Sequence, residues 1–136
     1  MPDELRGSCL CGSVTYECGG PPRVALHCHC RSCQKTSGSG HTTILVVSAD
    51  DLQVTGTLSF HQREADSGNT VTRGFCPACG SDIYSESSGH EGQVYLRASS
   101  LDDPNLAMPA MAIYTDQAIA WDHMDEGLPR FPGMPQ

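Results

Sequence analysis

Cysteine is the residue type whose spacing in this chain points most directly to chemistry. Seven of the eight cysteines fall into three short clusters, Cys9-x-Cys11, Cys28-x-Cys30-x-x-Cys33 and Cys76-x-x-Cys79. Zinc binds thiolates at about 2.3 Å, and cysteines close in sequence bring two thiolates to one ion. The spacing therefore predicts metal binding.

The clusters supply two, three and two ligands, which divides them into two kinds of site. The outer pairs together make a closed tetrahedral site of the kind that stabilises a fold. The middle cluster leaves one coordination position open, as catalytic zinc sites do. We predict a structural zinc on Cys9, Cys11, Cys76 and Cys79, and a catalytic zinc on Cys28, Cys30 and Cys33.

An even number of cysteines also fits a disulfide framework. The amino-terminal residues MPDELRGSC show no basic start followed by an apolar stretch, so we expect no secretory signal and a cytoplasmic protein with reduced thiols. Metal is therefore the preferred interpretation. Iron in the four-Cys site stays open, because a tetrahedral sulfur site suits both zinc and iron.

The length and the net charge of the chain restrict its domain organisation and the classes of molecule that it can bind. With 136 residues the chain predicts a single domain, 1–136, with a core over about 5–131 and an irregular tail. The net charge of −8 and the lack of a basic stripe argue against nucleic-acid binding. The longest apolar run, residues 44–47, is too short to span a membrane.

The elements that position the clusters are predicted to be short strands. Alternating apolar runs are separated by Gly, Pro, Asp, Asn and Ser, which is typical of an all-β chain. The expected strands cover residues 13–18, 24–27, 41–47, 52–55, 57–62, 70–75, 83–87, 93–98, 111–114 and 118–122. Helix is expected as one turn over 31–36 and another over 101–106, with a hairpin tip at 65–69.

Strand periodicity predicts where individual side chains point. Cys28 and Cys30 share one face of a strand end, and Cys33 follows on the first helical turn, where the helix dipole favours a thiolate. His29 then points the opposite way, as a residue supporting the ligands or as a surface residue. Cys18 alternates with apolar residues, so we expect it in the core.

The other histidines carry weaker signals. His41 follows a glycine-rich turn and could face the middle cluster, although nothing in the sequence requires it. The remaining histidines lack metal-ligand spacing and are expected on the surface or on strands: His27, His61, His90 and His123.

A zinc ion held by three thiolates favours thiol chemistry over hydrolysis. Such a centre carries a net charge of −1 and polarises a carbonyl weakly, but it can bind a substrate thiol and hold it as a thiolate. Arg31 and Lys35, beside the cluster, could bind the carboxylates of such a substrate; the alternative is a solvated basic turn.

The clusters stand within longer motifs that follow one another through residues 5 to 131. These are Gly7-Ser8-Cys9-Leu10-Cys11-Gly12-Ser13-Val14, Cys28-His29-Cys30-Arg31-Ser32-Cys33-Gln34-Lys35 with Ser37-Gly38, Phe75-Cys76-Pro77-Ala78-Cys79-Gly80-Ser81, and Leu101-Asp102-Asp103-Pro104, with Pro109, Ile113-Tyr114 and Trp121. In this order the motifs resemble the glutathione-dependent formaldehyde-activating enzyme family, which shares its domain with centromere protein V.

The resemblance implies a mainly β, Mss4-like β-tent of short antiparallel strands around zinc sites. It also implies two Zn²⁺ ions, a structural one on the outer pairs and a catalytic one on the middle triplet. The implied reaction adds glutathione to formaldehyde to give S-hydroxymethylglutathione, and the family is classed with carbon–sulfur lyases. Ser99-Ser100 and His41 depart from the family pattern, which has a glycine and an aromatic residue at these places.

A non-catalytic zinc module of Mss4-like fold, serving as an interaction or chaperone-like domain, is the alternative function. The middle cysteine cluster discriminates between these two functions. A position left open on the triplet favours an enzyme, and a permanent fourth thiolate favours the module.

Overall fold

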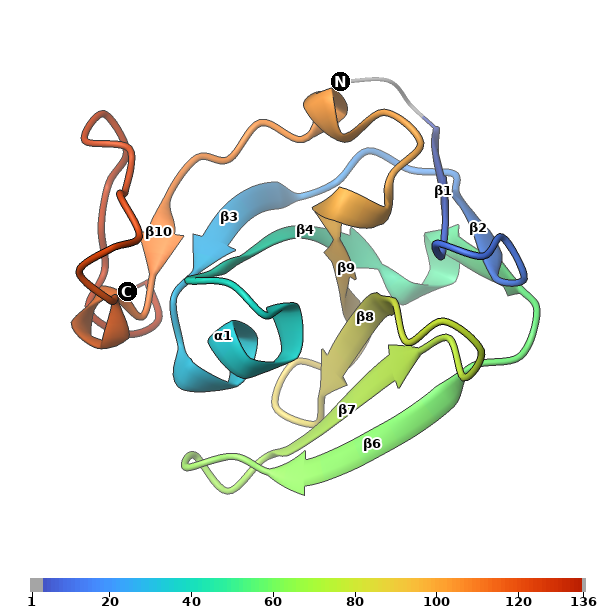
Figure 1. Cartoon of the computed structure of the whole chain (residues 1–136), viewed down its shortest axis with the longest axis horizontal. Helices are drawn as coiled ribbons and strands as arrows, with labels where there is room; N and C mark the ends of the chain where they lie inside the picture. Colours follow the sequence, from blue (N-terminus) through green and yellow to red (C-terminus); the bar gives the residue numbers. More distant parts are fainter. Residues whose placement is uncertain (1–3, 136) are drawn as a thin grey trace.

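The fold consists of two β-sheets, one short α-helix and several 3-10 turns (Figure 1). The computed structural model describes residues 4–135. The expectation of a mainly β chain built from short antiparallel strands is confirmed. Among the described residues no helix is long and apolar enough to cross a membrane.

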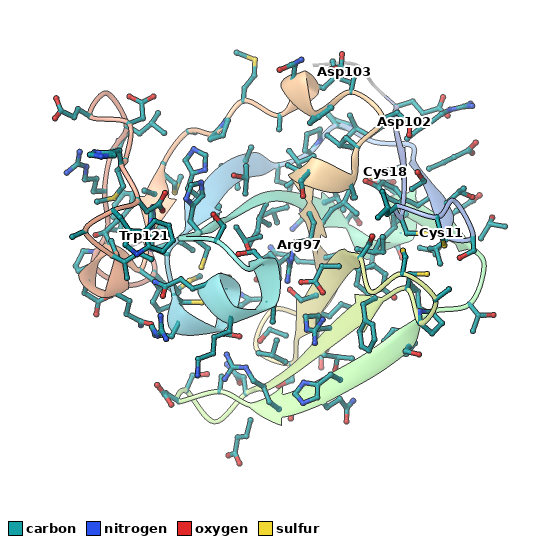
Figure 2. The ribbon with its side chains drawn as sticks, viewed as in Figure 1. Cys11, Cys18, Arg97, Asp102, Asp103 and Trp121 are labelled. Atoms are coloured by element: carbon teal, nitrogen blue, oxygen red, sulfur yellow. The ribbon has the colours of Figure 1, made fainter. Side chains whose placement is uncertain are left out.

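The smaller sheet carries the first cysteine pair. It has three antiparallel strands in the order β1-β2-β5, namely β1 (Leu5–Ser8), β2 (Thr15–Cys18) and β5 (Leu52–Thr55). Cys9 and Cys11 lie in the turn that joins β1 to β2. This turn lies beside the sheet at the right of Figure 2, where Cys11 is labelled.

The larger sheet has seven strands in the order β10-β3-β4-β9-β8-β7-β6. Among its strand pairs within residues 4–135, only β10–β3 is parallel. The strands are β3 (Val24–Cys28), β4 (Thr42–Ser48), β6 (Ser59–Glu64), β7 (Thr70–Phe75), β8 (Asp82–Ser87), β9 (Gln93–Arg97) and β10 (Ala112–Ile113). The middle cysteine cluster lies at the end of β3, and the last pair lies in the loop between β7 and β8.

Helix α1 (Arg31–Ser37) follows β3 directly and lies beside β4 (Figure 1). Cys30 is its N-cap, with a sulfur that accepts the Cys33 N–H at 3.3 Å. Gly38 ends the helix in the left-handed conformation at φ 68°, which glycine adopts without strain. The 3-10 turns are η1 (Ala49–Asp51), η2 (Ala98–Ser100), η3 (Pro104–Leu106) and η4 (Thr115–Gln117).

The main core lies between the two sheets and includes Leu5, Leu45 and Leu96, all with no exposed surface. Cys18 is also fully buried in this cluster, so its predicted place in the core is confirmed. A second apolar cluster surrounds the middle cysteines, with Leu26, Ile44 and Ile113. Cysteines of the outer pairs belong to the main core, and those of the middle cluster belong to the second apolar cluster.

Strand β1 was not expected from the sequence. Its residues Leu-Arg-Gly-Ser show little apolar alternation, but each pairs with a residue of β2. A Cβ on Gly7 would lie 2.2 Å from the Tyr16 hydroxyl oxygen, so glycine is what lets the Tyr16 ring cross this strand. Pairing with β2, rather than the local sequence pattern, therefore determines the extended conformation of β1.

Two predicted elements are wrong in part. Residues 118–122 form turns instead of a strand, with Asp122 N–H bonded to the Ile119 carbonyl and Trp121 67% exposed. The helix expected over 101–106 shrinks to the single 3-10 turn η3, capped by the Asp103 carboxylate. The hairpin tip at 65–69 is confirmed, and residues 125–135 form turns and bends with an isolated bridge between Arg130 and Ala112.

Candidate metal centres

The outer cysteine pairs meet at one point although 65 residues separate Cys11 from Cys76. All four sulfurs lie within 4.8 Å of one another. Measured separations are 3.6 Å for Cys9–Cys11 and 3.8 Å for Cys11–Cys76. A tetrahedral ion with bonds of about 2.3 Å needs sulfurs about 3.8 Å apart, so the donor set fits zinc.

Each pair is held by a tight turn that ends in a glycine. Gly12 and Gly80 each follow the second cysteine at a positive φ, 81° and 79°. The Gly12 N–H bonds to the Cys9 carbonyl, and the Gly80 N–H to the Cys76 carbonyl. In both loops a glycine with positive φ therefore turns the chain directly after the second cysteine, although the hydrogen bond spans three residues in the first loop and four in the second.

Two serines contact the sulfurs, and the sequence analysis missed both. The Ser13 hydroxyl lies 3.1 Å from Cys11 and 3.3 Å from Cys76, and the Ser81 hydroxyl lies 3.3 Å from Cys79. The Ser81 hydroxyl and backbone lower the pKa of Cys79 to about 5. The repeated Cys-Gly-Ser sequence at 11–13 and 79–81 was the available signal.

The middle cluster brings its three sulfurs together as predicted, again within 4.8 Å. Cys28 ends β3, Cys30 caps α1 and Cys33 lies in its first turn. No further His, Cys, Asp or Glu of residues 4–135 joins this group. Three thiolates fit an ion that keeps a fourth position for another ligand.

The three thiols of the middle cluster titrate unequally. Contacts from the Cys28 and Cys33 thiols, with the N–H of Cys33, lower the pKa of Cys30. Contacts with Cys30 and Cys33, followed by burial, raise the pKa of Cys28. Contacts with Cys28 lower the pKa of Cys33. Contacts with Cys30 and burial together have the larger effect, so the pKa of Cys33 is raised. Cys30 is therefore the thiol of this cluster that loses its proton first.

We expect zinc binding at this cluster to release two protons below the ordinary thiol pKa of about 8.5. In that range Cys30 is a thiolate, whereas Cys28 and Cys33 must each lose a proton to bind an ion. The apparent affinity should rise about 100-fold for each pH unit, tenfold per proton. Calorimetric titration of zinc in buffers of different ionisation enthalpy counts the protons. Release of three protons, or none, would contradict this charge distribution.

A cleft of about 840 Å³ lies between the end of α1 and the turn that carries the first cysteine pair, and Cys9 lines it, whereas Cys28, Cys30 and Cys33 do not. Its wall combines the end of α1, the start of β4, the Gly80–Asp82 loop and residues 97–102. Thr42 lines the cleft and donates its hydroxyl to the Cys33 carbonyl at 3.2 Å. The cleft therefore adjoins the backbone that carries the third thiol.

Arg97 supplies a buried cation to this cleft and was missed by the sequence analysis. It lies near the middle of Figure 2, is 5% exposed, and its charge partly offsets the rise in the pKa of Cys33. It donates to the Tyr95 carbonyl and the Ser85 hydroxyl, and its Nε lies 3.8 Å from Asp82. That Nε and Asp82 Oδ2 have no hydrogen-bond partner among the described residues. Only the tertiary fold places this cation beside the thiols.

Arg31 and Lys35, the predicted substrate anchors, are exposed on α1. Neither lines the cleft. The Arg31 guanidinium bonds to the Gln34 side chain, which also donates to the carbonyls of His29 and Gln117. Their role as anchors stays a prediction.

The histidines near the middle cluster are more enclosed than expected. His29 is 1% exposed, and burial, followed by the charge of His41, lowers its pKa. His41 does not complete the cysteine triplet, and instead its Nδ1 lies 2.6 Å from Asp122 Oδ2. His27 lies half-buried on β3 with Nδ1 2.8 Å from the Thr43 hydroxyl. Asp122 was not predicted from the sequence.

Comparison with known proteins agrees with this arrangement. The chain matches the family model described as "Glutathione-dependent formaldehyde-activating enzyme" over residues 4–117. A crystal structure of a Rhodobacter sphaeroides protein from the Northeast Structural Genomics programme is similar in fold, with a TM-score of 0.60 and 19% identity. That alignment covers 77% of this chain and 97% of the other. No curated protein matches. The chain belongs to the glutathione-dependent formaldehyde-activating enzyme family.

Proposed function

We propose that the protein adds glutathione, or a related thiol, to formaldehyde to give S-hydroxymethylglutathione, a reaction of the carbon–sulfur lyase class. Family membership supports the choice of substrates. The observation that carries the proposal is the convergence of Cys28, Cys30 and Cys33 into one group of three thiols. All eight cysteines are free, which favours a protein that functions in the reducing cytoplasm.

The residues of the site have separate tasks in this reaction. Cys28, Cys30 and Cys33 would hold a zinc ion, which supplies a position where a substrate thiol loses its proton. The thiol sulfur then forms the bond to the formaldehyde carbon, and the carbonyl oxygen takes up a proton to become the hydroxyl. Arg97, whose Nε has no hydrogen-bond partner among the described residues, would bind a substrate carboxylate in the cleft in competition with Asp82, from which its Nε lies 3.8 Å.

Titration of glutathione into the zinc-loaded protein tests the thiol, and the rate of S-hydroxymethylglutathione formation above the uncatalysed background tests the reaction. We expect calorimetric binding and an enzymatic rate that both disappear when the middle cluster loses its metal. Absence of glutathione binding at millimolar concentration would reject this substrate. Intact zinc content with no thiol binding would favour the non-catalytic module.

Arg31→Ala and Lys35→Ala should each raise the KM for glutathione about two- to fivefold and leave kcat unchanged. Both side chains are exposed, and an exposed ion pair contributes about 0.2–1 kcal/mol. Arg63→Ala, an equally exposed cation on β6, serves as the control. An unchanged KM in both variants would show that α1 is only a solvated basic turn.

A further inference from the structure

We propose that His29, His41 and Asp122 form a third metal site, which binds a divalent transition ion through two imidazoles and one carboxylate. Their ligand atoms lie within 4.8 Å of one another. Asp122 Oδ2 lies 2.6 Å from His41 Nδ1 and 3.5 Å from His29 Nδ1. This proposal does not depend on the thiol reaction.

His29 is the observation that points to an ion. Its ring is 1% exposed, and its Nδ1 has no hydrogen-bond partner among residues 4–135. Buried polar atoms in folded proteins are nearly always satisfied. A hydrogen-bonded His41–Asp122 pair alone leaves this nitrogen without a partner, whereas an ion between the three side chains accepts its lone pair.

Three chain segments build the site. His29 follows β3 and His41 precedes β4, and the two strands are joined in antiparallel register at the Cys28–Thr42 pair. Asp122 comes from the turns after β10, next to Trp121 at the left of Figure 2. A Cβ on Gly40 would lie 2.4 Å from the Asp122 Cβ, so glycine permits the close approach.

The site is separate from the thiolate site although their ligands alternate in sequence. Successive side chains of an extended segment point to opposite faces, so His29 projects away from Cys28 and Cys30. The group of three contains no sulfur. Two imidazoles with one carboxylate bind zinc, and with open positions they bind non-haem iron.

The ion can reach this site from solvent. His41 lines the cleft described above, and its side chain is 27% exposed. Asp122 is 13% exposed, whereas His29 closes the inner side. Positions not taken by the three residues therefore face the cleft, where water or a small ligand fits.

Co²⁺ added to protein already loaded with two zinc ions per chain tests the site, with native mass spectrometry and absorption spectra as readouts. We expect a third ion per chain, with cobalt d–d bands and without the charge-transfer bands that thiolate ligands produce. His41→Asn and Asp122→Asn should each weaken this binding more than about 100-fold, because loss of an outer hydrogen-bond partner alone costs about 10–100-fold.

His123→Asn, an exposed histidine next to Asp122, is the matched control and should bind the third ion normally. Retention of two zinc ions in each variant reports that the cysteine sites are still folded. The proposal is wrong if Co²⁺ enters only by displacing zinc with thiolate charge transfer. It is equally wrong if no third ion binds, or if the third ion survives both substitutions.

Discussion

Cys79→Ser is expected to lower the free energy of unfolding by more than about 3 kcal/mol and to remove one zinc ion per chain. Cys79 is one of four sulfurs that join the β1–β2 turn to the β7–β8 loop. Structural zinc sites in small peptides contribute about 10–16 kcal/mol, as much as a whole domain's stability of about 5–15 kcal/mol. Urea unfolding with metal analysis measures both effects.

Cys18→Ala is the matched control for this experiment. Cys18 is fully buried but belongs to none of the metal-ligating groups among the described residues. Its loss should cost about 1–2 kcal/mol, the usual penalty of a small core deletion, and leave both zinc ions in place. Equal destabilisation by the two substitutions would mean that the outer pairs do not hold a structural metal.

Cys30→Ser is expected to abolish the thiol reaction, with a fall in rate of more than about 100-fold, and to leave the fold intact. Cys30 is both a predicted zinc ligand and the N-cap of α1. Serine is a favoured N-cap, so its hydroxyl can accept the Cys33 N–H that the sulfur accepts now. The substitution therefore removes a ligand without removing the cap.

Zinc content, urea unfolding and the rate of adduct formation distinguish these two roles of Cys30. We expect one zinc ion per chain in place of two, and a smaller loss of stability than Cys79→Ser causes. Ser32→Ala, in the same turn of α1, should keep both zinc ions and the activity. Full activity of Cys30→Ser would remove the triplet from the mechanism.

The cysteine clusters are the part of the metal sites that could be predicted from the sequence alone. Ligands two or three residues apart are close in any extended or turn conformation, so the partition into two, three and two follows from spacing. The ten strands were also largely predictable, because alternation and turn residues are local signals. Strand β1 lacked such a signal, since its pairing with Tyr16 and its neighbours decides its conformation.

Arg97 and Asp122 lay beyond prediction for a physical reason. Each becomes part of a site only when distant segments pack together, Arg97 with Asp82 and Asp122 with His29 and His41. A side chain's burial and partners depend on these long-range contacts. Residues 118–122 illustrate the same limit. Their apolar composition predicted a strand, but they pair with neither of the two sheets.

The sequence by itself determined the family, the mainly β class and which cysteines share a cluster. These depend on short-range spacing and on the order of motifs along the chain. The tertiary structure alone decided that the outer pairs converge, that Ser13 and Ser81 contact their sulfurs, and that a cleft contains a buried arginine and Thr42, whose hydroxyl bonds to the Cys33 carbonyl. Those contacts exist only after the two sheets pack, which is why local sequence patterns do not contain them.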